Sequence, residues 1–268
     1  MTYATSIHRL PEPRDWDLFD PPNSPYYHQS PNLFRGLSRF LRSSHTLPNA
    51  IIIACIGIWW YGKTRQGTFS QPYRRTNIHT IRDAQSDLQV MDKHFVLSLE
   101  NLRAGRYYTL LTSSLMHYQP GHLLANLVGI LSFGPRIVDL YGVPAFIIIW
   151  VGSAVAGGLL EAYYWAKVEN RYVIRKAVGA SCSTMGLATV LACTRPEMMV
   201  PVWPIGIVLP IWLETVGYAI WSLIAFKNGW LPEVGHLGHF GGMAFGAFWW
   251  AVALQRKAFG HNSLAFPR

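Results

Sequence analysis

A run of small residues, GASC over 179–182, places a serine in a turn just before a long apolar stretch. Gly179 and Ala180 leave room for a tight turn and for the close approach of a neighbouring backbone. Ser181 then falls at the start of a predicted helix, where backbone N–H groups are free and the positive end of the helix dipole lies. A serine in this position can act as a nucleophile when a general base reaches its hydroxyl.

The first group of candidate partners lies in the segment LMHYQPGHLLANLVG, residues 115–129. His122 and Asn126 are four residues apart and share one helical face, and His117 precedes them by about one turn. Ionisable side chains inside membrane spans are costly and usually mark function. His122 and Asn126 alone are equally compatible with a polar contact that holds two helices together.

The second group lies in the segment VGHLGHFGGMAFGAF, residues 234–248. Its glycines Gly238, Gly242 and Gly246 recur at four-residue spacing, which lets another helix approach closely. His239 lies beside this stripe and would meet whichever helix packs there. His236 lies one turn earlier.

The serine turn and the two histidine-containing segments indicate a chemical function only when they are taken together. If Ser181 meets His239, the pair has the parts of an activated nucleophile and its general base. The backbone N–H of Ser181 can stabilise an oxyanion, and His122 and Asn126 add donors where negative charge develops on a scissile carbonyl. Attack of a serine nucleophile on a carbonyl group is the chemistry that this set favours.

The chain that positions these groups is apolar. Half of its 268 residues are hydrophobic and 14% are charged, against about 25% charged residues in soluble domains, which indicates a membrane protein. The net charge is +9, but no basic stripe with interleaved aromatic residues marks a nucleic-acid surface. Anionic membrane lipid is the expected partner of the flanking Lys and Arg residues. Six apolar segments predict an all-α polytopic bundle of six transmembrane helices: 47–62, 110–138, 141–165, 178–200, 202–226 and 234–254.

The polar ends of the chain are expected to lie outside the bundle. We expect a loosely ordered tail over 1–46, a membrane domain over 47–255 and a short C-terminal tail over 256–268. Within the first tail, residues 32–45 favour either a basic amphipathic helix on the membrane surface or an ordinary polar segment. The first apolar segment is shorter than the roughly 20 residues that a membrane span needs, so flanking residues must complete the span. A polar connection over 63–100 follows it.

The cysteines indicate no further chemistry. Cys55, Cys182 and Cys193 all lie in apolar stretches, and their odd number and spacing provide neither a disulfide framework nor a zinc site. Cys182 follows Ser181 directly, but one residue along a helix rotates the side chain by about 100°, so it is a poor alternative nucleophile.

Metal or haem binding in a transporter is another use for four of the histidines, namely His117, His122, His236 and His239. That interpretation leaves the Gly-Ala-Ser turn unexplained. It also lacks an intramembrane carboxylate cluster, because Glu161 and Glu214 are isolated and Glu161 is expected at the interface. We therefore expect neither a metal ion nor a cofactor.

Four segments, in this order, resemble the rhomboid family of intramembrane serine proteases. GRYYTLLTSSLMH (105–117) is similar to the end of the family's first loop, and HYQPGHLLANL (117–127) has the family's spacing of two histidines and an asparagine. GASC (179–182) resembles Gly-x-Ser-Gly, and HFGGMAFG (239–246) resembles His-x-x-Gly-x-x-x-Gly.

The resemblance covers roughly residues 47–255 and implies a six-helix core. The first-loop motif and LSFGP (131–135) look most like the mitochondrial branch. That branch implies the mitochondrial inner membrane as the location, with a secretory-pathway membrane as the alternative. The sequence indicates neither orientation nor oligomeric state.

The resemblance also implies roles for individual residues. Ser181 would be the nucleophile and His239 the general base and acid, without a third acidic residue. His122, Asn126 and the Ser181 amide would form the oxyanion hole. The helix of about 202–226 and the following loop would form the gate for a substrate's transmembrane helix. Structural neighbours of the site would be His117, Gly179, Cys182, Gly242 and Gly246.

Two positions depart from the family pattern. The glycine after the nucleophile is Cys182, and the position four after the serine, usually an aromatic residue that supports the histidine ring, is Met185. A thioether can contact a ring edge but fixes its orientation less well. These departures keep open the alternative of a catalytically inactive rhomboid-like protein that binds or escorts membrane clients.

Overall fold

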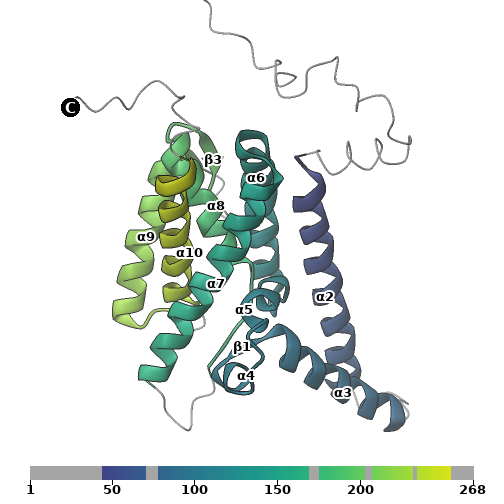
Figure 1. The fold of residues 1–268 in the computed structure, drawn as a ribbon. Coiled ribbons are helices and arrows are strands. Elements are labelled where there is room, and N and C mark those ends of the chain that lie inside the picture. Colours follow the sequence, from purple (N-terminus) through teal and green to yellow (C-terminus); the bar gives the residue numbers. More distant parts are fainter. Residues whose placement is uncertain (1–43, 71–77, 169–174, 203–206, 232–233, 255–268) are drawn as a thin grey trace, which may run out of the picture. The chain divides into compact units, whose positions relative to one another are not determined.

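The computed structural model describes residues 44–70, 78–168, 175–202, 207–231 and 234–254, all within the unit Arg42–Arg268. The long helices of this unit run alongside one another as a bundle (Figure 1). The predicted tails, including the candidate amphipathic helix, lie almost entirely outside the described residues.

Each of the six predicted apolar segments contains a helix. These are α2 (Thr46–Ser70), α6 (Pro120–Tyr141), α7 (Val143–Lys167), α8 (Ser181–Thr194), α9 (Ile211–Asn228) and α10 (His236–Trp249), which a π-helical turn over Trp250–Leu254 continues. Among the described helices, three are long and apolar enough to cross a membrane, namely α6, α7 and α10 with its π-helical turn, and α8 is a shorter apolar helix. The predicted all-α membrane bundle is confirmed, whereas the count of six crossings stays a prediction.

The first apolar segment extends into its polar flank. Helix α2 continues to Ser70, so flanking residues do lengthen it. The predicted polar connection over 63–100 contains regular structure after α2, namely α3 (Ile78–Phe95), β1 (Leu97–Ser98) and α4 (Leu99–Arg103). Helix α3 is polar in composition but amphipathic, and it packs on α2. Its side chains Ala84 and Met91 are buried, and its Asp87 forms an ion pair with Arg65 of α2.

The second apolar segment is not one helix from residue 110. A short helix α5 (Thr109–Thr112) and a 3-10 turn η2 (Ser113–Leu115) come first, and α6 begins at Pro120. Proline suits the first position of a helix because it has no N–H to lose and its φ is already helical. His117 therefore lies in the connection before α6, and not on that helix as expected.

The predicted segments 178–200 and 202–226 are separated by a hairpin. Helix α8 ends at Thr194, and β3 (Met199–Pro201) pairs antiparallel with β4 (Val208–Pro210) before α9 begins. Proline cannot continue a helical ladder, and both strands of the hairpin end in proline. A second short pair joins β1 to β2 (Lys176–Ala177), at the opposite end of the bundle from β3 (Figure 1).

Helix α8 packs at the centre of the bundle, where Leu187, Val190 and Leu191 are fully buried. Its contact with α10 is backbone against backbone. A Cβ added to Gly242 would collide with the carbonyl oxygen of Cys182, and one added to Gly246 would lie 2.5 Å from that of Gly186. The glycine stripe of α10 thus lets the two helices that carry Ser181 and His239 meet closely.

Candidate active site

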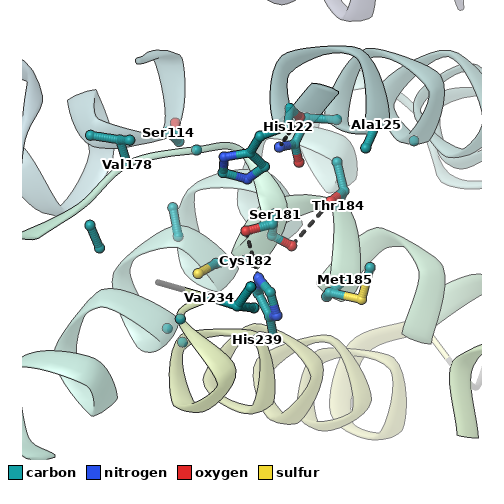
Figure 2. A pocket seen from close by; sticks show the side chains of 18 of the residues that line it. Ser114, His122, Ala125, Val178, Ser181, Cys182, Thr184, Met185, Val234 and His239 are labelled. Atoms are coloured by element: carbon teal, nitrogen blue, oxygen red, sulfur yellow. Dashed lines mark hydrogen bonds between the residues drawn. The ribbon is translucent and has the colours of Figure 1, made fainter. Parts of the chain in front are cut away.

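Two side chains from α8 and α10 meet where these helices begin. Ser181 is the first residue of α8 and His239 lies in the first turn of α10. The Nε2 atom of His239 is 2.7 Å from the Oγ atom of Ser181, and the contact is visible in Figure 2. His239 is only 7% exposed, so bulk water does not compete for this hydrogen bond. A hydroxyl hydrogen-bonded to an imidazole has the geometry of an activated nucleophile.

The turn before Ser181 is held in place by three separate contacts. The strand pair β1–β2 ends there, with Leu97 opposite Ala177. The Gly179 N–H then donates to the Ser113 carbonyl at 2.9 Å. The Ala180 N–H donates to Nε2 of His117 at 3.4 Å. His117, 1% exposed, is therefore part of the support of the turn.

His122 and Asn126 project from the first turns of α6 toward this turn. The ring of His122 lies so close to Gly179 that a Cβ at that position would overlap its Cε1 atom. Figure 2 shows His122 and His239 on opposite sides of Ser181. Asn126 is buried, and its Nδ2 donates to the His122 carbonyl at 3.0 Å. The structure thus brings together the four side chains that the sequence singles out.

A cavity of about 790 Å³ contains the site. His122, Asn126, Ser181 and His239 all line it. The wall also includes residues of α7 and α9, and Lys176 on β2. This volume lies within the range of about 300–1,000 Å³ that is typical of ligand pockets.

Residues 104–256, more than half of the 268-residue chain, match the family model described as the Rhomboid domain. The chain belongs to the rhomboid family. The predicted resemblance is confirmed, and the fold described above is that of a rhomboid membrane bundle.

This rhomboid chain is also similar to individual curated proteins. It is 31% identical to RHOMBOID-like protein 12, mitochondrial, of Arabidopsis thaliana over 78 residues, which cover 29% of this chain and 23% of the relative. It is 30% identical to the human presenilin-associated rhomboid-like protein, mitochondrial, over 148 residues, 52% of this chain and 36% of the relative. It is 25% identical to rhomboid protease GluP of Bacillus subtilis over 167 residues, 60% of this chain and 29% of the relative.

The chain spans less than half the length of each of these relatives. The two mitochondrial relatives confirm the predicted branch, and the chain is a mitochondrial multi-pass membrane protein.

Cys182 directly follows Ser181, where the resemblance in sequence leads one to expect glycine. Its side chain packs between two glycines of neighbouring helices, because a Cβ on Gly157 of α7 or on Gly238 of α10 would lie 2.8 Å or 3.1 Å from the Cys182 sulfur. Small residues on both neighbours therefore make space for this side chain.

Glu161 differs from the expectation of an isolated interfacial carboxylate. It is 9% exposed, and its Oε2 accepts a hydrogen bond from the Gly238 N–H at 2.7 Å. Gly238 lies in the first turn of α10, where backbone N–H groups have no partner within the helix. Glu161 thus caps, from α7, the helix that carries His239. Its distance in sequence from residue 238 explains why spacing alone does not reveal this role.

Tyr218 on α9 is a second residue that the motifs miss. Its hydroxyl lies 2.7 Å from Nδ1 of His239. One turn further along α9, the Oγ atom of Ser222 lies 2.8 Å from Nδ1 of His236. A sequence signal does exist, because Glu214, Tyr218 and Ser222 recur every four residues along one face of an otherwise apolar helix.

The metal interpretation of the histidines has little geometric support. Both ring nitrogens of His236 have protein partners, Ser222 at 2.8 Å and the Trp230 carbonyl at 3.1 Å. Within the described ranges, no group of three or more His, Cys, Asp or Glu side chains is placed to hold a metal ion.

Proposed function

We propose that this rhomboid protein is an intramembrane serine endopeptidase that cleaves transmembrane segments of other membrane proteins with Ser181 and His239. The observation that carries the proposal is the 2.7 Å contact between Ser181 Oγ and His239 Nε2 at the meeting point of two helix N-termini. The protease named among the relatives, from Bacillus subtilis, also supports it.

The proposed reaction uses both residues twice. His239 takes the Ser181 proton as the hydroxyl attacks the scissile carbonyl, and then gives that proton to the leaving amine. Water hydrolyses the acyl-enzyme in a second cycle with the same proton transfers. Each step needs His239 to accept at Nε2, which is the nitrogen that faces Ser181. No cofactor enters the scheme.

Three donors are positioned for the oxyanion in this proposal. The Ser181 N–H belongs to the first turn of α8, so the helical ladder does not use it. His122 lies against Gly179, beside the nucleophile. Asn126 has two amide hydrogens and donates one to the His122 carbonyl, which leaves the second for the substrate. A donor of this kind is worth about 10²–10³ in kcat.

Replacing Gly179 tests this arrangement. Gly179 has a φ of 121° and contacts the ring of His122, so Gly179→Ala is expected to displace that donor and lower kcat by roughly 100-fold. The matched control is Gly105→Ala, because Gly105 also has a positive φ (76°) but has nothing within 4 Å of its Cβ position. Gly105→Ala also places a side chain at a positive φ, and we expect it to keep its activity in a cleavage assay. Equal activity of the two variants would contradict the placement of His122.

Water and substrate both need a route to Ser181. Two polar side chains from outside the long helices line the cavity, Gln119 just before α6 and Lys176 on β2, and this supports access of water. A substrate helix must unwind locally, because its carbonyls are already hydrogen-bonded, so glycine, alanine or proline near the cut favours cleavage. We propose α9 as the gate, with the mitochondrial inner membrane as the location.

An inactive protein that binds or escorts membrane clients remains the second candidate function. The presence of Cys182 at a motif glycine favours it. Against it, the sulfur is accommodated between Gly157 and Gly238, and the hydrogen-bond contact between Ser181 Oγ and His239 Nε2 is intact.

The two functions differ in what happens to a client. The full chain is reconstituted in liposomes with a single-span protein that carries glycine and alanine in its span, and products are mapped by mass spectrometry. The protease proposal predicts a cut within the span for wild type and none for Ser181→Ala. Stable binding of the uncut client by both proteins would support the escort function instead.

A further inference from the structure

Tyr218 holds the one ring nitrogen of His239 that the nucleophile does not use. The Tyr218 hydroxyl is 2.7 Å from Nδ1 and the Ser181 hydroxyl is 2.7 Å from Nε2. The Tyr218 and His239 ring centroids are 5.6 Å apart at an interplanar angle of 52°. The imidazole is therefore held at both nitrogens and along one side of its ring.

When the Ser181 hydroxyl donates to Nε2, the Tyr218 contact fits one tautomer of His239, because the phenolic oxygen can accept a hydrogen bond from Nδ1–H. A neutral imidazole carries one hydrogen, and Nε2 can accept a proton from Ser181 only when that hydrogen is on Nδ1. Nδ1–H then donates to the phenolic oxygen of Tyr218. When His239 takes the serine proton and becomes cationic, the same oxygen still accepts from Nδ1–H and stabilises the charged ring. A buried acceptor at the far nitrogen of a catalytic histidine is the general way in which its tautomer and orientation are set.

Tyr218 also supplies what Met185 does not. The resemblance leads one to expect an aromatic residue four positions after the nucleophile as the support of the histidine ring, and this chain has Met185 there. Met185 lies beside the dyad in Figure 2, but its thioether cannot orient an imidazole through a strong hydrogen bond. Tyr218 reaches the same ring from a different helix, α9, and adds a hydrogen bond to the ring contact.

Through these contacts, the position of helix α9 affects the general base His239. Tyr218 and Ser222 are four residues apart on α9, and they contact His239 and His236, three residues apart on α10. The outer face of α9 is apolar and exposed, with Val216 48% and Ile220 56% exposed. A movement of α9 away from α10 would break the Tyr218 contact and release the His239 ring.

We propose that Tyr218 is a positioning residue of this rhomboid, which fixes the tautomer and orientation of His239 from the helix α9. The role deepens the proposed protease function and rests on it for its catalytic meaning. The hydrogen bond itself, and the tautomer that it selects, do not depend on whether the protein cleaves a substrate.

The test compares wild type with Tyr218→Phe, which keeps the ring and removes the hydroxyl. Ser222→Ala is the matched control, because it removes the neighbouring contact from α9 to α10 without touching His239. Two quantities are measured on the full chain: kcat and KM for a transmembrane substrate, and the ¹⁵N chemical shifts of the histidine side chains. The shifts report which ring nitrogen is protonated, and His239→Gln identifies the signals of His239.

The proposal predicts that Tyr218→Phe lowers kcat by about tenfold, the order expected for one buried hydrogen bond, with KM nearly unchanged. It also predicts that the Nδ1–H signal of His239 is lost or mixed with the other tautomer, whereas Ser222→Ala keeps kcat within about twofold and leaves that signal unchanged.

The two readouts separate the two proposals. If wild type does not cleave but Tyr218→Phe still changes the tautomer of His239, the positioning role holds and the protease function fails. If the tautomer is the same in wild type and Tyr218→Phe, the positioning role is overturned, whether or not the protein cleaves. An equal loss of kcat in Ser222→Ala would likewise overturn it, because docking of α9 alone would then account for the effect.

Discussion

Replacing either member of the dyad with alanine is expected to lower cleavage by roughly 10⁴-fold or more, and replacing both is expected to cost no more than one. The reason is that Ser181 and His239 act as one unit through a single hydrogen bond. Without His239 the hydroxyl has no base, and without Ser181 the base has no nucleophile to activate. Whatever rate remains comes from substrate binding and the oxyanion donors.

This expectation is measured by cleavage of a transmembrane substrate with four proteins: wild type, Ser181→Ala, His239→Ala and the double variant. Thermal unfolding of each protein shows that the bundle remains intact. Losses that multiply in the double variant would contradict a shared mechanism, since independent contributions add in free energy.

Gly242→Ala is expected to destabilise the bundle by about 3 kcal/mol or more, at or above the upper end of the costs of overpacking. The added methyl group would collide with the carbonyl oxygen of Cys182, which belongs to the α8 backbone and cannot rotate away. The gain in helix propensity from glycine to alanine, about 1 kcal/mol, does not offset this collision. The same shift of α10 would separate His239 from Ser181, so activity should fall with stability.

The matched control for this substitution is Gly217→Ala on α9. Gly217 is exposed and helical, and nothing lies within 4 Å of its Cβ position. We expect this variant to unfold at the wild-type temperature or slightly above it, because the substitution raises helix propensity and causes no collision. Unfolding temperatures in detergent measure both variants. A Gly242→Ala protein as stable as wild type would show that α8 and α10 are not in backbone contact.

The parts of the site that sequence predicts are those encoded by local patterns. The small residues around Ser181 indicate a tight turn at a helix start, and the spacing of Gly238, Gly242 and Gly246 indicates a close helix contact beside His239. The structure brings these two places together. His122 and Asn126 share a face of α6, as four-residue spacing requires.

The parts that sequence does not predict depend on how separate elements dock. Tyr218 and Glu161 act on α10 from α9 and α7, and nothing in the α10 sequence indicates which side chains approach it. Helix α3 is missed for a different reason, because its polar composition is that of a connection although its buried face packs on α2. Pro120 explains the shift of His117 out of α6, since the helix begins at that proline.

Labelling with a fluorophosphonate probe shows whether Ser181 is an activated nucleophile. The purified, detergent-solubilised full chain is compared with its Ser181→Ala, His239→Ala and Cys182→Ala variants. If His239 activates Ser181, the probe labels wild type and Cys182→Ala but neither Ser181→Ala nor His239→Ala. A folded wild type that is not labelled, above all if Cys182→Gly restores labelling, would contradict this activation and favour the client-binding function.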